Sequence, residues 1–207
     1  MRMPWQLINF TLSCKTAWAR IRRMKPVLFL MAPGFEEIEF CAPVDILRRL
    51  EVPVTLVGVQ GRSVEGAHGI TMWADMLLVD VDSSQYSGVV LPGGAASWTL
   101  RDTPGVLKLV REMQAADKLV AAICAAPIAL EAAGVIQQRK ITCYPAKAVT
   151  DDIQSAAHIS DEPTVREGNL ITGRGPGAAL EFGYALAAYF CPQDKVDALR
   201  HEMCADK

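Results

Sequence analysis

The chain has 207 residues, of which 51% are hydrophobic and 21% are charged, and its formal net charge is −2 at pH 7. This length and composition are typical of one α/β domain with a well-buried core. Charges of both signs are spread along the chain, which argues against a nucleic-acid-binding protein with a basic face. The longest apolar runs are too short to span a bilayer, so we expect no membrane partner.

The cysteines form no CxxC pair and no Cys/His spacing that fits a zinc site, so we expect neither a metal nor a cofactor. No secretion signal with a cleavage site is recognisable. Free thiols in a reducing cytoplasm are therefore the favoured interpretation, although an even number also permits disulfides. The six cysteines are Cys14, Cys41, Cys124, Cys143, Cys191 and Cys204.

Residues 1–23 do not match the pattern that follows. An apolar cluster that includes Trp5 and Phe10 precedes a basic stretch. An amphipathic surface helix and a targeting arm are both compatible with this composition. We favour an upstream extension of the reading frame, because Met24 stands just before the first convincing strand. We therefore predict a single domain over 24–207 and an extension of uncertain status before it.

From Pro26 onward, strand-like and helix-like segments alternate. Continuous apolar runs indicate strands that are buried on both faces, and acidic starts, basic ends and glycines delimit the helices. Strands are expected at 26–32, 53–59, 87–94 (ending in a glycine turn), 118–124, near 140–143 and at 163–173; helices at 36–50, from Pro104 onward, and at 125–134, 178–190 and 193–204; and a hairpin at 61–75. This alternation predicts an α/β fold with a mostly parallel sheet and helices on both faces.

Cys124 stands where the strand-like run KLVAAIC gives way to a helical run. Its surroundings, Ala122-Ile123-Cys124-Ala125-Ala126, have the small-x-nucleophile-x-small form of a nucleophile elbow. Small neighbours are needed because such a turn is sharp and its backbone strained. A following helix amino terminus is expected to lower the pKa of the thiol and favour the thiolate. The alternative is that Cys124 is a small buried hydrophobe.

Glu39 is the second candidate for chemistry. Glu36 and Glu37 are expected to complement the start of the helix dipole, whereas Glu39 lies deeper in an apolar turn. Pro43 lacks the N–H that would bond the carbonyl of Glu39, and a kink there would turn the Glu39 side chain toward the strand ends. A carboxyl group in an apolar pocket is pushed toward its protonated form and can donate a hydrogen bond. An exposed glutamate is the alternative.

Two glycine-rich segments are candidates for binding loops. The glycines of LPGGAAS offer backbone amides that could stabilise an oxyanion, although most glycine turns are only turns. Residues 173–177 lack the G-x-G-x-x-G spacing and an acidic partner, so we do not expect a dinucleotide site there.

The segments APGFEEIEFCAPVDILRR, VVLPGG, AAICAAP and ITGRGPGAALEF resemble the ThiJ/PfpI superfamily in order and spacing. They look closest to the branch that contains the Parkinson-disease-associated protein deglycase and its bacterial homologues. The resemblance runs from about Met24 to about Arg200 and implies a flavodoxin-like three-layer sandwich, usually a homodimer. It implies that Cys124 is the reactive cysteine and that Glu39 hydrogen-bonds its thiolate or sulfinate.

The same resemblance implies roles for residues around this pair. The oxyanion amides fall on Gly94 and Ala125, and Gly93 adjoins them. Arg49 corresponds to an arginine near the dimer interface and pocket of the family.

The sequence departs from the family where a histidine is expected. Many relatives have a histidine directly after the nucleophile, where this chain has Ala125, and the closest branch has one where this chain has Tyr144. His68 lies in the predicted hairpin, where the branch has a residue that reaches the pocket of the partner subunit; a plain surface residue is the alternative. His158 and His201 carry no signal.

Three functions follow from the resemblance. The first is a glyoxalase or deglycase that acts on a small reactive carbonyl or a glycated protein. The second is a redox-sensing or chaperone stress protein whose cysteine oxidises to sulfinate without turnover. The third is an intracellular protease or amidase, which the missing Cys–His pair disfavours. For all three we expect a cytoplasmic homodimer without a cofactor.

Overall fold

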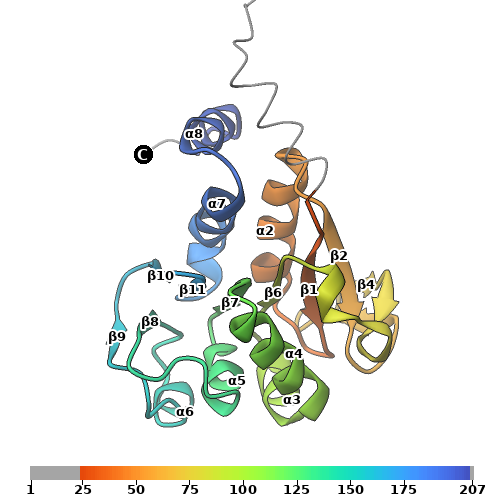
Figure 1. Cartoon of the computed structure of the whole chain (residues 1–207), viewed down its shortest axis with the longest axis vertical. Coiled ribbons are helices and arrows are strands. Elements are labelled where there is room, and N and C mark those ends of the chain that lie inside the picture. Colours follow the sequence, from red (N-terminus) through yellow and green to blue (C-terminus); the bar gives the residue numbers. More distant parts are fainter. Residues whose placement is uncertain (1–23, 206–207) are drawn as a thin grey trace, which may run out of the picture.

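The computed structural model describes residues 24–205, so the apolar cluster and the basic stretch predicted within residues 1–23 lie outside it. Its central sheet has seven strands in the order β10-β11-β7-β6-β1-β2-β5, and every pair is parallel except β10 with β11 (Figure 1). The strands are β1 Val27–Met31, β2 Val54–Gly58, β5 Met76–Leu77, β6 Gly88–Leu91, β7 Leu119–Ile123, β10 Thr164–Glu167 and β11 Leu170–Gly173.

Two small sheets flank the central one. Strands β3 (Ser63–Glu65) and β4 (Thr71–Trp73) pair antiparallel and form the hairpin that the sequence predicted. Strands β8 (Lys140–Thr142) and β9 (His158–Ser160) pair in parallel.

The helices cover both faces of the central sheet and make three layers (Figure 1). Helices α2 and α7 pack together on one side, with α8 against α7, whereas α3, α4 and α5 pack together on the other. The helices are α2 Glu37–Arg49, α3 Ala96–Asp102, α4 Pro104–Ala115, α5 Pro127–Ala132, α6 Lys147–Thr150, α7 Ala179–Phe190 and α8 Gln193–Glu202, with 3-10 turns at Leu78–Asp80, Ser83–Gln85 and Pro176–Ala178. The predicted flavodoxin-like α/β sandwich is confirmed.

The core lies between these layers. Strands β1, β6 and β7 are buried along their whole length, as their continuous apolar runs predicted. Helix α7 approaches α2 closely through Gly183, where an added Cβ would lie 2.6 Å from Ile46 Cδ1 and 3.0 Å from Pro43 Cα. This packing fixes α2, and with it the acidic residues of its first turn, against the sheet.

Several elements differ from the sequence-based expectation. Helix α3 directly follows the glycine turn, where only a turn was expected, and α5 begins at Pro127 rather than at 125. The helix expected at 36–50 is present, with Pro43 inside it as expected. The strand structure expected at 163–173 is the antiparallel pair β10 and β11.

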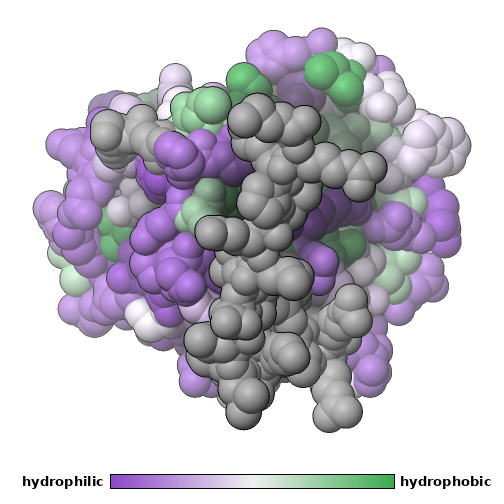
Figure 2. All heavy atoms as spheres, turned by 90° about the horizontal axis from the view of Figure 1, so that it is seen from above, coloured by the Kyte–Doolittle hydropathy of each residue, from purple (hydrophilic) through white to green (hydrophobic). Residues whose placement is uncertain are grey.

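Figure 2 looks down on the end of the molecule that is uppermost in Figure 1. Among the described residues on this face, hydrophilic side chains predominate and hydrophobic ones lie in small, separate areas. No helix within residues 24–205 has the length and the apolar character needed to cross a membrane. The cytoplasmic location stays a prediction.

Candidate active site

Cys124 lies on the turn between β7 and α5 and has a left-handed backbone with φ +64°. For a residue other than glycine, this conformation costs on the order of 1–3 kcal/mol and persists only where its surroundings impose it. The backbone N–H of Cys124 donates to Gly173 O at 2.9 Å, and its carbonyl accepts from the Tyr144 N–H at 2.8 Å. The strained turn that the sequence predicted at Cys124 is therefore present, and it is held from two neighbouring segments.

Glu39 lies in the first turn of α2 with its side chain turned inward, and only 1% of the residue is exposed. Its Oε2 accepts a hydrogen bond from the Gly93 N–H at 2.8 Å. Its Oε1 is buried and has no nitrogen or oxygen partner in the described part of the chain. The remaining interaction of this carboxyl group is a hydrogen bond with the side chain of Cys124. The exposed alternative for Glu39 is thus wrong.

Two glycines allow this approach of acid and thiol. A Cβ at Gly93 would overlap Glu39 Oε2 and would lie 3.0 Å from Cys124 Sγ. Gly94 has φ +77°, and a Cβ there would lie 2.8 Å from the backbone nitrogen of Glu36. The loop after β6 can therefore pack between the loop before α2 and the turn at Cys124 only because it carries no side chains at these positions.

The pKa of Cys124 is raised to about 12, chiefly by burial and then by the nearby Glu39 carboxylate. Hydrogen bonds from the backbone N–H groups of Gly94 and Ala125 act in the opposite direction. The predicted lowering of this pKa by the helix amino terminus is wrong for the resting protein. The physical reasons are that α5 starts three residues later, at Pro127, and that Cys124 is only 8% exposed.

The pKa of Glu39 is raised to about 7 because burial disfavours its charge, and hydrogen bonds from Cys124 and Gly93 offset part of that effect. A carboxyl and a thiol in contact titrate as a pair, because ionisation of one disfavours ionisation of the other. The raised pKa of the thiol keeps it protonated in the resting site. Near neutral pH, ionised Glu39 is placed to accept this proton as the sulfur bonds to an electrophile. The two amides facing the sulfur remain available for the negative charge that results.

A pocket of about 370 Å³ opens beside the turn. Tyr144 connects the two, because its backbone bonds Cys124 while its partly exposed ring lines the pocket. The remaining lining residues are Pro145, Pro163, Arg174, Gly175, Pro176, Gly177 and Ala178. Tyr144, where the resemblance led us to expect a histidine, thus presents a phenol to this pocket.

Other predicted site residues are not brought to Cys124 within this chain. Arg49 is the last residue of α2 and donates to Asp45 Oδ2 at 2.7 Å. It lies about 15 Å from Glu39 along the helix axis at 1.5 Å per residue. His158 lies exposed in β9 and His201 lies exposed in α8. A role for Arg49 at a dimer interface stays a prediction.

His68 lies at the tip of the β3–β4 hairpin with 71% of its side chain exposed, and its ring bonds Glu37 at 2.9 Å. Its approach to the site of a second subunit stays a prediction. Glu37, expected only to complement the helix dipole, also accepts from the backbone N–H groups of His68 (2.7 Å) and Ile70 (3.4 Å). A Cβ at Gly66 would overlap Glu37, so the hairpin turn can pack against this carboxylate only with a glycine at position 66. This glycine is the feature of the sequence that could have indicated the contact.

These features agree with the similarity of the chain to known proteins. A sequence profile of the DJ-1/PfpI family matches residues 25–189. Protein dj-1beta of Drosophila melanogaster is 36% identical over 174 residues, which are 83% of this chain and 92% of that protein. Its crystal structure superposes with a TM-score of 0.83 at 34% identity and covers 89% of this chain and 100% of that one.

Two further relatives have activities in their names. Glutathione-independent glyoxalase DJ-1 of Schizosaccharomyces pombe is 32% identical over 85% of this chain and 96% of that protein. Deglycase TK1284 of Thermococcus kodakarensis is 33% identical over 73% of this chain and 90% of that protein. With this similarity and the family match over most of its length, the chain belongs to the DJ-1/PfpI family.

Proposed function

We propose that this protein is a cysteine-dependent enzyme of the glyoxalase or deglycase type, acting on small reactive carbonyls or their adducts with protein. The observation that carries the proposal is the contact between the buried Glu39 carboxyl and the Cys124 side chain, with the amides of Gly94 and Ala125 directed at the sulfur. Relatives named as a glyoxalase and a deglycase support the same chemistry.

The first step is addition of Cys124 to an aldehyde such as that of methylglyoxal. The sulfur forms a bond to the aldehyde carbon, the C=O π bond breaks, and the thiol proton passes to Glu39. The developing oxyanion accepts hydrogen bonds from the Gly94 and Ala125 amides. Return of the proton from Glu39 to this oxygen gives a neutral hemithioacetal.

The second stage moves a proton within the bound carbonyl compound. Ionised Glu39 takes the proton from the carbon that carries sulfur and returns one to the neighbouring carbon, while the hydroxyl proton passes from the oxygen of the first carbon to the oxygen of the second. The hemithioacetal becomes a 2-hydroxy thioester through an enediol. Water then cleaves the C–S bond, giving lactate and the free Cys124 thiol. No oxidant is consumed, because one carbon is oxidised while its neighbour is reduced.

Glu39 takes the acid–base role that histidine would otherwise share. Ala125 and Tyr144 stand at the two positions where the family resemblance led us to expect histidine, so neither position supplies an imidazole. A carboxyl group with a pKa of about 7 is suited to both accepting and donating a proton there. The same absence gives no support to a protease mechanism based on a Cys–His pair.

The test is consumption of methylglyoxal and formation of lactate by the purified full-length protein. Cys124→Ser should abolish turnover, whereas the matched control Cys191→Ser, which changes another buried cysteine, should retain it. Circular dichroism and thermal denaturation establish that both variants are folded. Turnover by folded Cys124→Ser at the wild-type rate would refute the proposal.

A redox-sensing function is the second candidate, and the same contact favours it. A protonated Glu39 and the amides of Gly94 and Ala125 are placed to bond the oxygens of a sulfinate on Cys124. Mild peroxide treatment followed by mass spectrometry tests this function. Oxidation concentrated on Cys124 in a protein without carbonyl turnover would favour the sensor over the enzyme, whereas even oxidation of all cysteines would eliminate the sensor.

We also propose that the chain forms a homodimer through the outer side of α2 and the β3–β4 hairpin. Large hydrophobic side chains are exposed there, namely Ile38, Ile70 and Trp73. The hairpin lies beside α2, because Cys41 Sγ is 3.8 Å from Met72 Sδ. Light scattering coupled to gel filtration should give twice the mass of the chain for the wild-type protein. For Trp73→Asp it should give the mass of a single chain. A monomeric wild-type protein would disprove the dimer.

A further inference from the structure

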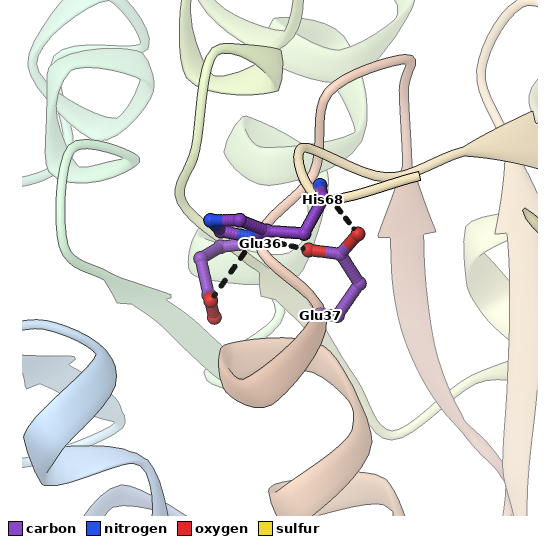
Figure 3. Close-up of side chains that lie close together, drawn as sticks. All are labelled: Glu36, Glu37 and His68. Carbon is purple, nitrogen blue, oxygen red and sulfur yellow. Dashed lines mark hydrogen bonds and ion pairs between the residues drawn. The ribbon is translucent and has the colours of Figure 1, made fainter. Parts of the chain in front are cut away.

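Glu36, Glu37 and His68 bring three metal-ligating side chains together outside the Cys124 site (Figure 3). The two glutamates begin α2 and the histidine comes from the tip of the β3–β4 hairpin. One ligand atom from each lies within 4.8 Å of the other two. His68 Nδ1 is 2.9 Å from Glu37 Oε2 and 3.9 Å from Glu36 Oε1. The three side chains thus converge on one point.

Each carboxylate is held in place by backbone amides through one of its oxygens. Glu36 Oε2 accepts from the Glu39 N–H at 2.7 Å, and Glu37 Oε1 accepts from the N–H groups of His68 and Ile70. The other oxygen of each carboxylate faces the His68 ring. Partners that fix the orientation of ligating groups in this way are characteristic of metal sites.

Glu36 supplies a second, independent observation. Its side chain is only 9% exposed, and its Oε1 accepts no hydrogen bond within residues 24–205, although it is directed at the imidazole. Two carboxylates with buried side chains therefore meet one exposed histidine ring. Glu36 Oε1 thus keeps lone pairs for a cation at this point, and such an ion would also offset the repulsion between the two neighbouring carboxylates.

We propose that Glu36 Oε1, Glu37 Oε2 and His68 Nδ1 form a binding site for a divalent first-row transition ion of the zinc type. Ligands 2.0–2.2 Å from a tetrahedral ion are about 3.3–3.6 Å apart. The distance from His68 Nδ1 to Glu37 Oε2 must therefore increase slightly, and that to Glu36 Oε1 must decrease slightly. The exposed imidazole can make this adjustment while the carboxylates stay fixed. Water completes the coordination.

The donor set also determines the class of ion and the proton balance. Imidazole with carboxylates suits zinc, cobalt and nickel, whereas magnesium and calcium prefer oxygen ligands alone. The ion replaces the proton that His68 Nδ1 shares with Glu37, and this proton is released to solvent. Sequence spacing could not reveal such a site, because Glu37 and His68 are separated by 31 positions.

The experiment measures binding of Zn²⁺ and Co²⁺ to the full-length protein after treatment with EDTA and its removal. Calorimetry should show one Zn²⁺ per chain, with no comparable uptake of Mg²⁺. His68→Ala should weaken Zn²⁺ binding at least about tenfold, since even partners outside the first coordination shell are worth 10–100-fold. His158→Ala, which removes another exposed histidine, should bind as the wild type does.

The nearby thiols provide the decisive comparison. Cys124 contacts Glu39, and Cys41 lies close enough to Glu37 and Glu36 for their charges to raise its pKa, after the larger effect of burial. The Co²⁺ complex should show ligand-field bands without the strong thiolate-to-metal charge transfer of a cysteine ligand. Cys124→Ser and Cys41→Ser should each retain Zn²⁺ binding. Binding that survives His68→Ala but is lost in either cysteine variant, or no Zn²⁺ binding at all, would overturn the proposal.

Discussion

Glu37 and Glu39 lie in the same turn of α2 and are both buried, yet their pKa values are displaced in opposite directions. For Glu37, burial acts to raise the pKa, but hydrogen bonds from the His68 ring and from the His68 and Ile70 amides outweigh it, and the pKa is lowered. For Glu39, burial prevails and the pKa rises to about 7. Burial by itself therefore does not determine the charge of a carboxyl group.

The difference lies in the donors around each carboxylate. The hairpin loop covers Glu37 and supplies it with N–H donors. Glu39 receives one amide, from Gly93, and otherwise faces a thiol, which is a weak donor. The same helix turn thus holds one acid that stabilises the fold when ionised and another that is poised to exchange a proton.

The largest expected effect is on catalytic activity, which should depend on Glu39 and hardly on Glu37. Glu39→Gln should lower kcat/KM for methylglyoxal about 10²–10⁴-fold, which is the usual contribution of a general acid–base group. Glu37→Gln, assayed with EDTA present, should have a far smaller effect, because Glu37 does not contact Cys124 or the pocket. Equal losses in the two variants would show that the contrast between the acids has no bearing on catalysis.

The second effect is on the stability of the fold. The Glu39 carboxyl ionises near its ordinary pKa of 4.5 when unfolded but near 7 when folded. Its ionisation therefore destabilises the fold increasingly from pH 4.5 to about 7 and by a constant amount above that. Glu39→Gln should raise the free energy of unfolding by up to about 3 kcal/mol at pH 8 and much less at pH 5. Urea denaturation at both pH values measures this; a gain that does not depend on pH would contradict it.

Glu37→Gln should act in the opposite direction. Because the folded pKa of Glu37 is lowered, its ionised form stabilises the fold above pH 4.5, and this contribution is lost as the pH falls through the folded pKa. The substitution weakens charge-assisted hydrogen bonds and should cost about 1–3 kcal/mol at pH 7. Urea denaturation in EDTA should show the deficit shrinking toward pH 3, and an increase in stability at pH 7 would refute it.

The smallest effect is expected from His68→Ala, because the ring is largely exposed. The hydrogen bond and charge of Glu37 raise the pKa of His68 above 6.5. Its contribution to stability is therefore fully present below pH 6.5 and is lost as the pH rises through the folded pKa. In EDTA at pH 6, His68→Ala should lower the melting temperature by less than Glu37→Gln does. At pH 9, the melting temperature of His68→Ala should be close to that of the wild type. A deficit that grows with pH would be inconsistent with this pair.

Much of the fold could be predicted from local sequence patterns. The apolar runs that form β1, β2, β6 and β7 are buried along most of their length, and their continuous apolar character predicted strands of a parallel sheet. Helix α3 escaped prediction because its glycine and alanine start reads as a turn, and because its seven residues are too few for a clear helical period.

The sequence by itself determined the order of the main strands and of most helices, the sharp turn at Cys124 and the glycines at positions 93 and 94, because backbone preference and hydrophobic pattern are local properties. Only the tertiary structure decided the protonation of the thiol and the two acids. The pKa of Cys124 depends on burial and on Glu39, which is 85 positions away in the sequence, and that of Glu37 depends on a hairpin loop. Electrostatic environment is set by what folds against a group, and neighbours in sequence do not reveal it.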